Sequence, residues 1–123
     1  MKESQLRNYL EAKPGAYVDY PFDEHTRVYK LGGKKGKMFA LISENEDPLR
    51  INLKCDPADA LALRAEHTAI IPGYHMNKKL WNTVILDGSL PDSLVAEMID
   101  QSYALIVSSL PLKLREKYRS ESQ

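Results

Sequence analysis

The chain has 123 residues, and its 17 Lys and Arg balance its 17 Asp and Glu, so the formal net charge is zero. This length is typical of one domain with one hydrophobic core, and 43% hydrophobic with 28% charged residues excludes a disordered chain and a membrane protein. Zero net charge also argues against a uniformly basic nucleic-acid-binding surface, because such domains are usually strongly basic. Any site for a polyanion must therefore be a local patch.

The first ten residues are polar and mixed in charge, without the apolar run of a signal peptide. No apolar stretch approaches the roughly 18 residues of a membrane span. The single cysteine, Cys55, has no partner for an internal disulfide, which agrees with a reducing compartment. We therefore expect a cytoplasmic protein without membrane contact, in which Cys55 is a buried structural thiol rather than a nucleophile.

The first half of the chain predicts a helix and three strands. The helix covers Ser4–Lys13 at helical spacing and is stopped by Pro14-Gly15. Three runs rich in β-branched, aromatic and aliphatic residues follow, separated by Gly-rich or Asp/Pro-containing turns: Thr26–Leu31, Lys37–Ser43 and Leu49–Lys54. The third run alternates strictly, so one face of this strand meander points to the core and the other is expected to be wet.

The second half predicts helices around one more strand. The expected elements are a helix opened by Asp56-Pro57, a short apolar piece at Thr68–Ile71, a type II turn at Pro72-Gly73, a strand at Trp81–Leu86, a long helix from Asp92 to Leu110, and a short basic helix at Lys113–Tyr118. Strands flanked by helices without βα alternation predict the α+β class, an antiparallel sheet with helices on one face. We expect a single domain over residues 1–118, with a frayed tail at 119–123.

The charges are unevenly distributed along the chain. Residues 26–54 hold seven cations and three anions, whereas residues 87–110 hold four anions and no cation. If helices cover one face of the sheet, the cations gather on strands and loops. A few Lys or Arg contacts to phosphate suffice for weak DNA binding, although a solvated sheet face explains the same pattern.

The segment Gly32–Lys37 resembles a phosphate loop only superficially. Its spacing is one residue short, Met38 replaces the Ser or Thr, and a strand rather than a helix follows. A cationic hairpin tip is expected instead, on which Lys34, Lys35 and Lys37 contact phosphates without reading sequence, or which is simply a solubilising turn.

The sequence offers little support for catalysis or metal binding. His25, His67, His75 and Cys55 share no metal-ligand spacing, no Gly-x-Ser-x-Gly motif is present, and Asp56 and Asp59 are explained by helix capping. We therefore expect no metal, no cofactor and no enzymatic activity. A general-base role for His75 is the alternative in the enzyme class.

The segment Pro72–Val84 concentrates aromatic and hydrogen-bonding groups without a helical or strand period. Trp81 is expected to be a core anchor, since it begins a strand and is the only indole. Tyr74, His75, Asn77, Lys78 and Lys79 are harder to explain as core. An alternative to DNA binding is therefore a small-ligand or protein-binding site formed by the Tyr74–Trp81 segment.

Residues 72–111 resemble the MmcQ/YjbR family of small bacterial proteins. They share its Gly-Tyr-His-Met-Asn-Lys-Lys core, Trp-Asn pair, Asp-Gly-Ser-Leu-Pro turn and Ser-Tyr in the last helix, and the earlier Lys-Met-Phe-Ala, Leu-Arg-Ile-Asn-Leu-Lys and Cys-Asp-Pro stretches also fit. The resemblance implies a two-layer, frataxin-like (CyaY-like) α+β sandwich and a DNA-binding role with two wings. Here the wings fall on Gly32–Lys37 and Tyr74–Lys79.

Iron binding does not carry over from the frataxin-like fold, because the first helix has only Glu3 and Glu11 and the first strand is basic. The leading expectation is weak, salt-sensitive binding of double-stranded DNA by a protein whose oligomeric state is left open. The expected nucleic-acid-binding residues are Lys34, Lys35, Lys37, Arg50, Lys54, Tyr74, His75, Asn77, Lys78 and Lys79.

Overall fold

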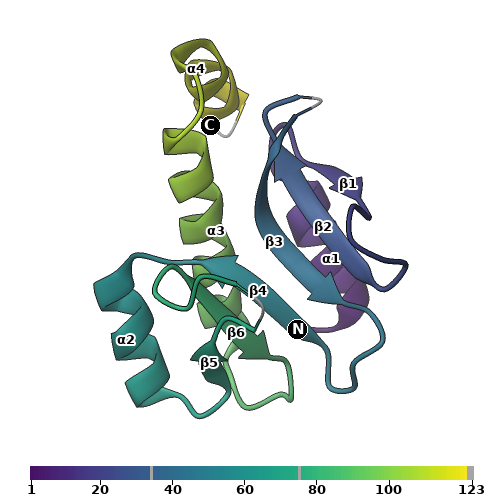
Figure 1. Ribbon diagram of the computed structural model, residues 1–123, viewed down its shortest axis with the longest axis vertical. Coiled ribbons are helices and arrows are strands. Elements are labelled where there is room, and N and C mark those ends of the chain that lie inside the picture. The colour runs from purple at the N-terminus through teal and green to yellow at the C-terminus, as the bar shows by residue number, and fades with distance from the viewer. Residues whose placement is uncertain (34, 75, 122–123) are drawn as a thin grey trace.

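The computed structural model describes residues 1–33, 35–74 and 76–121. Within them the chain forms one antiparallel sheet of six strands, in the order β1-β2-β3-β4-β6-β5, with helices on one face (Figure 1). The elements are α1 Glu3–Glu11, β1 Tyr17–Asp19, β2 Thr26–Leu31, β3 Lys37–Ser43, β4 Arg50–Lys54, α2 Pro57–Glu66, β5 Ile70–Pro72, β6 Trp81–Ile85, α3 Asp92–Ser108 and α4 Leu112–Glu121. The predicted α+β class is confirmed.

The central strands β2, β3 and β4 form the meander expected from sequence, each antiparallel to the next. The short strand β1 was not predicted, and it pairs with β2 at one edge of the sheet. The short apolar piece becomes β5, which pairs with β6 at the other edge. Pro72 is tolerated there because an edge strand leaves one row of backbone groups unpaired.

Two local predictions were wrong. Gly73 does not have the positive φ that a type II turn at Pro72-Gly73 requires, and Pro72 ends β5 instead. A Cβ on Gly73 would lie 2.8 Å from the Cβ of Trp81, so close packing rather than turn geometry demands glycine here. The C-terminal helix also continues to Glu121, so residues 119–121 of the expected frayed tail are helical, while residues 122–123 lie outside the described residues.

The main core lies between the sheet and the two helices α1 and α3. Leu6 and Leu10 of α1 are fully buried there, and the rings of Phe39 and Tyr103 meet edge-on with centroids 5.5 Å apart. Ser102 of α3 is buried, and its hydroxyl donates to the Phe39 carbonyl (2.6 Å) and accepts from the Lys54 N–H (2.9 Å). The long helix is thereby tied to both β3 and β4.

The opposite face of the sheet is only partly wet, which corrects the expectation of a solvated face. Val28, Leu41 and Trp81 form a second buried cluster there. Met38, Met76 and Leu80 cover this cluster, and the last two come from the segment between β5 and β6. The prediction that Trp81 anchors buried structure is confirmed, but on the face away from α1 and α3.

Cys55 is buried, as predicted. No helix in the part of the chain that the structure describes is long and apolar enough to cross a membrane.

Candidate functional site

The β2–β3 hairpin tip is fixed by backbone geometry and by one tyrosine. Gly32 and Gly33 have φ of 97° and 80°, a region that favours glycine. The Tyr17 hydroxyl donates to the Gly33 carbonyl (2.5 Å) and accepts from the Gly36 N–H (3.2 Å). The two glycine-rich sides of the tip are therefore held together from β1.

The lysines predicted on this tip have different surroundings. Lys35 is exposed, and so is Lys37, whose ammonium group donates to the Ser109 carbonyl (3.1 Å). Lys34, the third predicted phosphate contact of this wing, lies outside the described residues.

The second predicted wing is the loop that joins β5 to β6. Arg64 of α2 donates to the carbonyls of Lys78 and Trp81 and to Oδ1 of Asn82 (2.7 Å), so this guanidinium holds the end of the loop. The Asn77 side chain accepts from the Lys79 N–H (3.0 Å), which makes Asn77 a turn-forming residue.

The side chains predicted to bind on this second loop are largely accessible. Tyr74, Lys78 and Lys79 are exposed, and the Tyr74 N–H donates to the Thr83 hydroxyl (3.1 Å). His75 lies outside the described residues, so its predicted roles in binding or as a general base have no geometry here.

Both loops leave the sheet at the same end. The hairpin tip precedes β3, the second loop precedes β6, and β4 ends between them, with Lys54 paired to Trp81 (Figure 1). Arg50 lies at the opposite end of β4, about 13 Å away at the usual rise per residue. The structure therefore groups the predicted loop lysines with Lys54 and separates them from Arg50.

The Lys and Arg residues predicted to bind nucleic acid are not neutralised by carboxylates of the described residues. Within the described residues, none of them has a carboxylate within 4.0 Å, whereas Arg7, Lys13, Arg27 and Lys30 are all in ion pairs. The unpaired set is Lys35, Lys37, Arg50, Lys54, Lys78 and Lys79. Such a set can attract an anion without first breaking an internal salt bridge.

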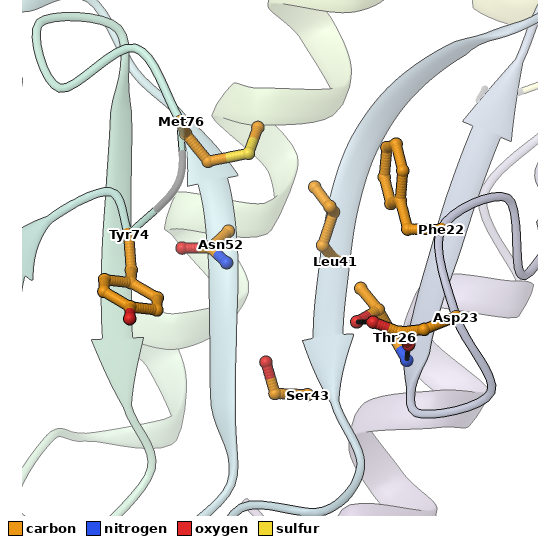
Figure 2. A pocket seen from close by; sticks show the side chains of 8 residues that line it. All are labelled: Phe22, Asp23, Thr26, Leu41, Ser43, Asn52, Tyr74 and Met76. Carbon is orange, nitrogen blue, oxygen red and sulfur yellow. Dashed lines mark hydrogen bonds between the residues drawn. The ribbon is translucent and has the colours of Figure 1, made fainter.

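A groove that was not predicted as a whole crosses the face of the sheet away from α1 and α3, and we call it the open-face groove. Figure 2 shows the side chains that line its first hollow. The groove consists of two adjoining hollows. The first, of about 240 Å³, is lined by Phe22, Asp23, Thr26, Leu41, Ser43, Asn52, Tyr74 and Met76. The second, of about 260 Å³, is lined by Ser43, Glu46, Arg50, Asn52, Tyr74 and Thr83.

Asp23 shapes one wall of the groove. Its carboxylate accepts from the N–H groups of His25 (2.8 Å) and Thr26 (2.7 Å) and from the Thr26 hydroxyl (3.1 Å). The two backbone hydrogen bonds lower the pKa of Asp23 below its usual value. This carboxylate therefore organises the loop that carries Phe22 and is poorly suited to act as a base.

The described residues contain no group of three or more His, Cys, Asp or Glu that could hold a metal ion. Burial raises the pKa of the Cys55 thiol, and the nearby charges of Asp59 and Asp56 raise it further. A thiol with a raised pKa has little thiolate at neutral pH, so Cys55 is chemically suited to packing rather than to nucleophilic attack.

Sequence reasoning found part of the groove. It singled out Tyr74 and Arg50, which line it, and it proposed a pocket containing Tyr74 and Trp81, although Trp81 belongs to the buried cluster instead. It missed Phe22, Leu41, Ser43, Asn52, Met76 and Thr83. The one available signal was the alternation of β4, which placed the amide of Asn52 between two cations on one face.

The fold places the chain among α+β sandwiches, with an open antiparallel sheet, two helices packed on one face and loops over the other. The model of the YjbR family matches residues 11–105. The chain belongs to the YjbR family, which confirms the resemblance seen in residues 72–111.

The relatives agree with this assignment. The chain is 38% identical to the uncharacterized protein YjbR of Escherichia coli K12 over 94% of this chain and 96% of that protein, and 28% identical to YyaQ of Bacillus subtilis over 85% and 98%. Protein DR2400 of Deinococcus radiodurans has a crystal structure with a TM-score of 0.88 at 39% identity, covering 94% of this chain and 86% of that chain. A Pseudomonas syringae protein aligns with a TM-score of 0.73 at 29% identity, covering 86% and 99%.

Proposed function

We propose that this member of the YjbR family is a non-enzymatic, cytoplasmic protein that binds double-stranded DNA through phosphate contacts. The observation that supports it is the grouping, on two loops at one end of the sheet, of cations that have no ion pair among the described residues. The described residues that would make the contacts are Lys35, Lys37, Lys54, Lys78 and Lys79. Contacts of this kind position a protein on the duplex without reading its sequence.

The expected affinity is weak and depends strongly on salt. Each phosphate contact contributes about 0.9 to the slope of log affinity against log salt, so five contacts predict an affinity loss of about 500-fold between about 50 and 200 mM salt. Asp56 and Asp59, two and five residues after Lys54 at the start of α2, oppose the approach of phosphate there. The proposal therefore gives the largest share of binding to the two loops.

The test is a salt titration of binding to random duplex DNA with paired variants. Removing two contacts in Lys78→Ala/Lys79→Ala should lower the slope by about 1.8, and Lys35→Ala should lower it by about 0.9. Lys113→Ala/Lys117→Ala, which removes the same charge from exposed positions on α4, is the matched control and should leave the slope unchanged.

Two results would contradict the proposal. One is the absence of duplex binding at about 50 mM salt, where phosphate contacts are strongest. The other is an equal loss of slope in the α4 control, which would mean that net charge rather than the loop surface governs binding.

A further inference from the structure

The middle of the open-face groove is built on one row of facing residues. Val28, Leu41, Asn52 and Thr83 are register partners across β2, β3, β4 and β6. Asn52 is only 9% exposed, and it stands between the apolar side of the row and the hydroxyl of Thr83. An amide placed so deeply needs hydrogen-bond partners for both its oxygen and its nitrogen.

The hydrogen bonds around Thr83 fix the direction of this amide. The Tyr74 N–H donates to the Thr83 hydroxyl oxygen (3.1 Å), so the hydroxyl's own proton is left to bond elsewhere, and it donates to Oδ1 of Asn52. Oδ1 therefore faces Thr83 and Nδ2 faces the groove, as Figure 2 shows with the nitrogen on the side of Ser43. The Nδ2 group of Asn52 has no hydrogen-bond acceptor among the described residues, so this donor points into the groove.

Arg50 adds a second donor to the same groove. It lies two residues before Asn52 on the same face of β4, lines the second hollow, and has no ion pair among the described residues. The carboxylate of Asp23 is occupied by its own turn. Glu46 also lines the second hollow, but it belongs to the β3–β4 loop and is exposed, whereas Arg50 and Asn52 lie on β4. This end of the groove thus presents two hydrogen-bond donors, Nδ2 of Asn52 and the Arg50 guanidinium. A ligand that complements them carries an oxygen-bearing anionic group.

The other end of the groove is apolar. Leu41 forms its floor, Met76 approaches from the β5–β6 loop, and Phe22 is 63% exposed on the opposite loop (Figure 2). Together these side chains give the first hollow an apolar lining, which is the usual character of a small-molecule site.

We propose that the open-face groove binds a small carboxylic acid with a flat, apolar body. The carboxylate accepts hydrogen bonds from the Arg50 guanidinium and from Nδ2 of Asn52, and the body lies between Phe22, Leu41 and Met76. The two hollows, about 240 and 260 Å³, suit a molecule of about 8 to 14 non-hydrogen atoms. This site is separate from the loop lysines proposed to contact DNA.

The probe is 3-phenylpropanoate, titrated into ¹⁵N-labelled protein and followed by NMR. The side-chain NH₂ signal of Asn52 should shift in a saturable way, together with the backbone signals of Leu41 and Met76. The neutral alcohol 3-phenylpropan-1-ol keeps the ring and loses the charge, and it should bind about tenfold more weakly or worse.

Two variants locate the carboxylate. Arg50→Gln removes the charged donor from a half-buried position, and Asn52→Asp replaces the amide donor by a repelling carboxylate; each should weaken binding about tenfold or more. Arg119→Gln, on the exposed side of α4, is the matched control and should bind like the unmodified protein. If Asn52→Asp does not fold, the affinities of Arg50→Gln and of the unmodified protein for the acid and the alcohol still test whether the carboxylate binds in the groove.

The inference is overturned if benzoate, phenylacetate and 3-phenylpropanoate all fail to give a saturable shift at Asn52 up to about 10 mM. It is equally overturned if the alcohol binds as well as the acid, or if Arg50→Gln binds as well as the control. The acid is titrated in the absence of DNA, so this proposal and the proposed function can fail separately.

Discussion

Several polar side chains around the open-face groove and the two loops bond to backbone groups rather than to solvent. Asp23 binds the N–H groups of the turn before β2, and Tyr17 bridges both sides of the β2–β3 tip. Thr83 joins the Tyr74 backbone to Asn52. Because each residue fixes the path of a loop, replacing it changes the shape of the surface and not only one functional group.

Cys55 provides a test at the residue scale. Its thiol pKa is raised by burial and by the negative charges of Asp59 and Asp56, so the thiolate that reacts with iodoacetamide is scarce below that pKa and grows as the pH rises through it. We expect alkylation of the folded protein at pH 8 to be at least about tenfold slower than in urea. Equal rates, measured by mass spectrometry, would show that Cys55 is accessible and ordinary.

At the scale of elements, α2 acts as a support for the β5–β6 loop. The Arg64 guanidinium reaches from α2 to the carbonyls of Lys78 and Trp81 and to the side chain of Asn82. Asn82 is 2% exposed, and its own Nδ2 is buried without a partner among the described residues. The loop that carries Lys78 and Lys79 is therefore held from one side by a single charged residue.

Replacing this support should destabilise the protein measurably. Arg64→Met keeps much of the aliphatic volume but leaves several acceptors without their charged donor, and we expect a loss of about 2 to 4 kcal/mol in the free energy of unfolding. Arg119→Met at an exposed position is the control and should change it by less than about 0.5 kcal/mol. Indistinguishable urea midpoints for the two variants would show that Arg64 does not support the loop.

The accuracy with which the sequence predicted each helix or strand depended on the length of the element and on the turn residues beside it. β2 and β3 were found with their observed bounds because both are runs of six or seven β-forming residues beside Gly-rich turns. β1 was missed because three residues are too few to show alternation. The Pro72-Gly73 pair was wrongly predicted to be a type II turn because glycine is used both for positive φ and for close packing. The structure shows that close packing against Trp81 is the reason for glycine here.

The groove could not be derived from sequence for a different reason. Its walls come from loops around Phe22 and Tyr74, about fifty positions apart, and their approach depends on the strand order β2-β3-β4-β6. The lysines on the two loops were easier to find, because surface charge is visible locally in a sequence. Local patterns thus identified exposed groups, while the cavity depended on topology.

At the scale of the whole molecule, the turn that follows α1 packs against the C-terminal helix α4. The turn after α1 contains Gly15, with φ of 79°, and a Cβ there would lie 2.3 Å from the ring of Tyr118 in α4. The Tyr103 hydroxyl of α3 donates to the Pro14 carbonyl in the same turn (2.6 Å). The helix α4, which lies beyond the residues matched by the family model, is therefore an integral part of this structure.

This packing predicts a large effect from one aromatic residue. Tyr118→Ala removes a ring that is 6% exposed and should lower the free energy of unfolding by about 3 to 4 kcal/mol. Leu112→Ala in the same helix removes a side chain that is 57% exposed and should cost less than about 0.5 kcal/mol. Urea denaturation of both variants measures the difference, and similar losses would mean that α4 is only loosely attached.

The two outer strands of the sheet also determine how copies of the protein can meet. β1 and β5 are three residues long each, and β5 ends in Pro72, which has no N–H to donate. A second chain that tried to extend the sheet would find too few backbone groups in a row to form a stable ladder. The protein is thereby protected against edge-to-edge aggregation, and any self-association must use a face or a loop instead.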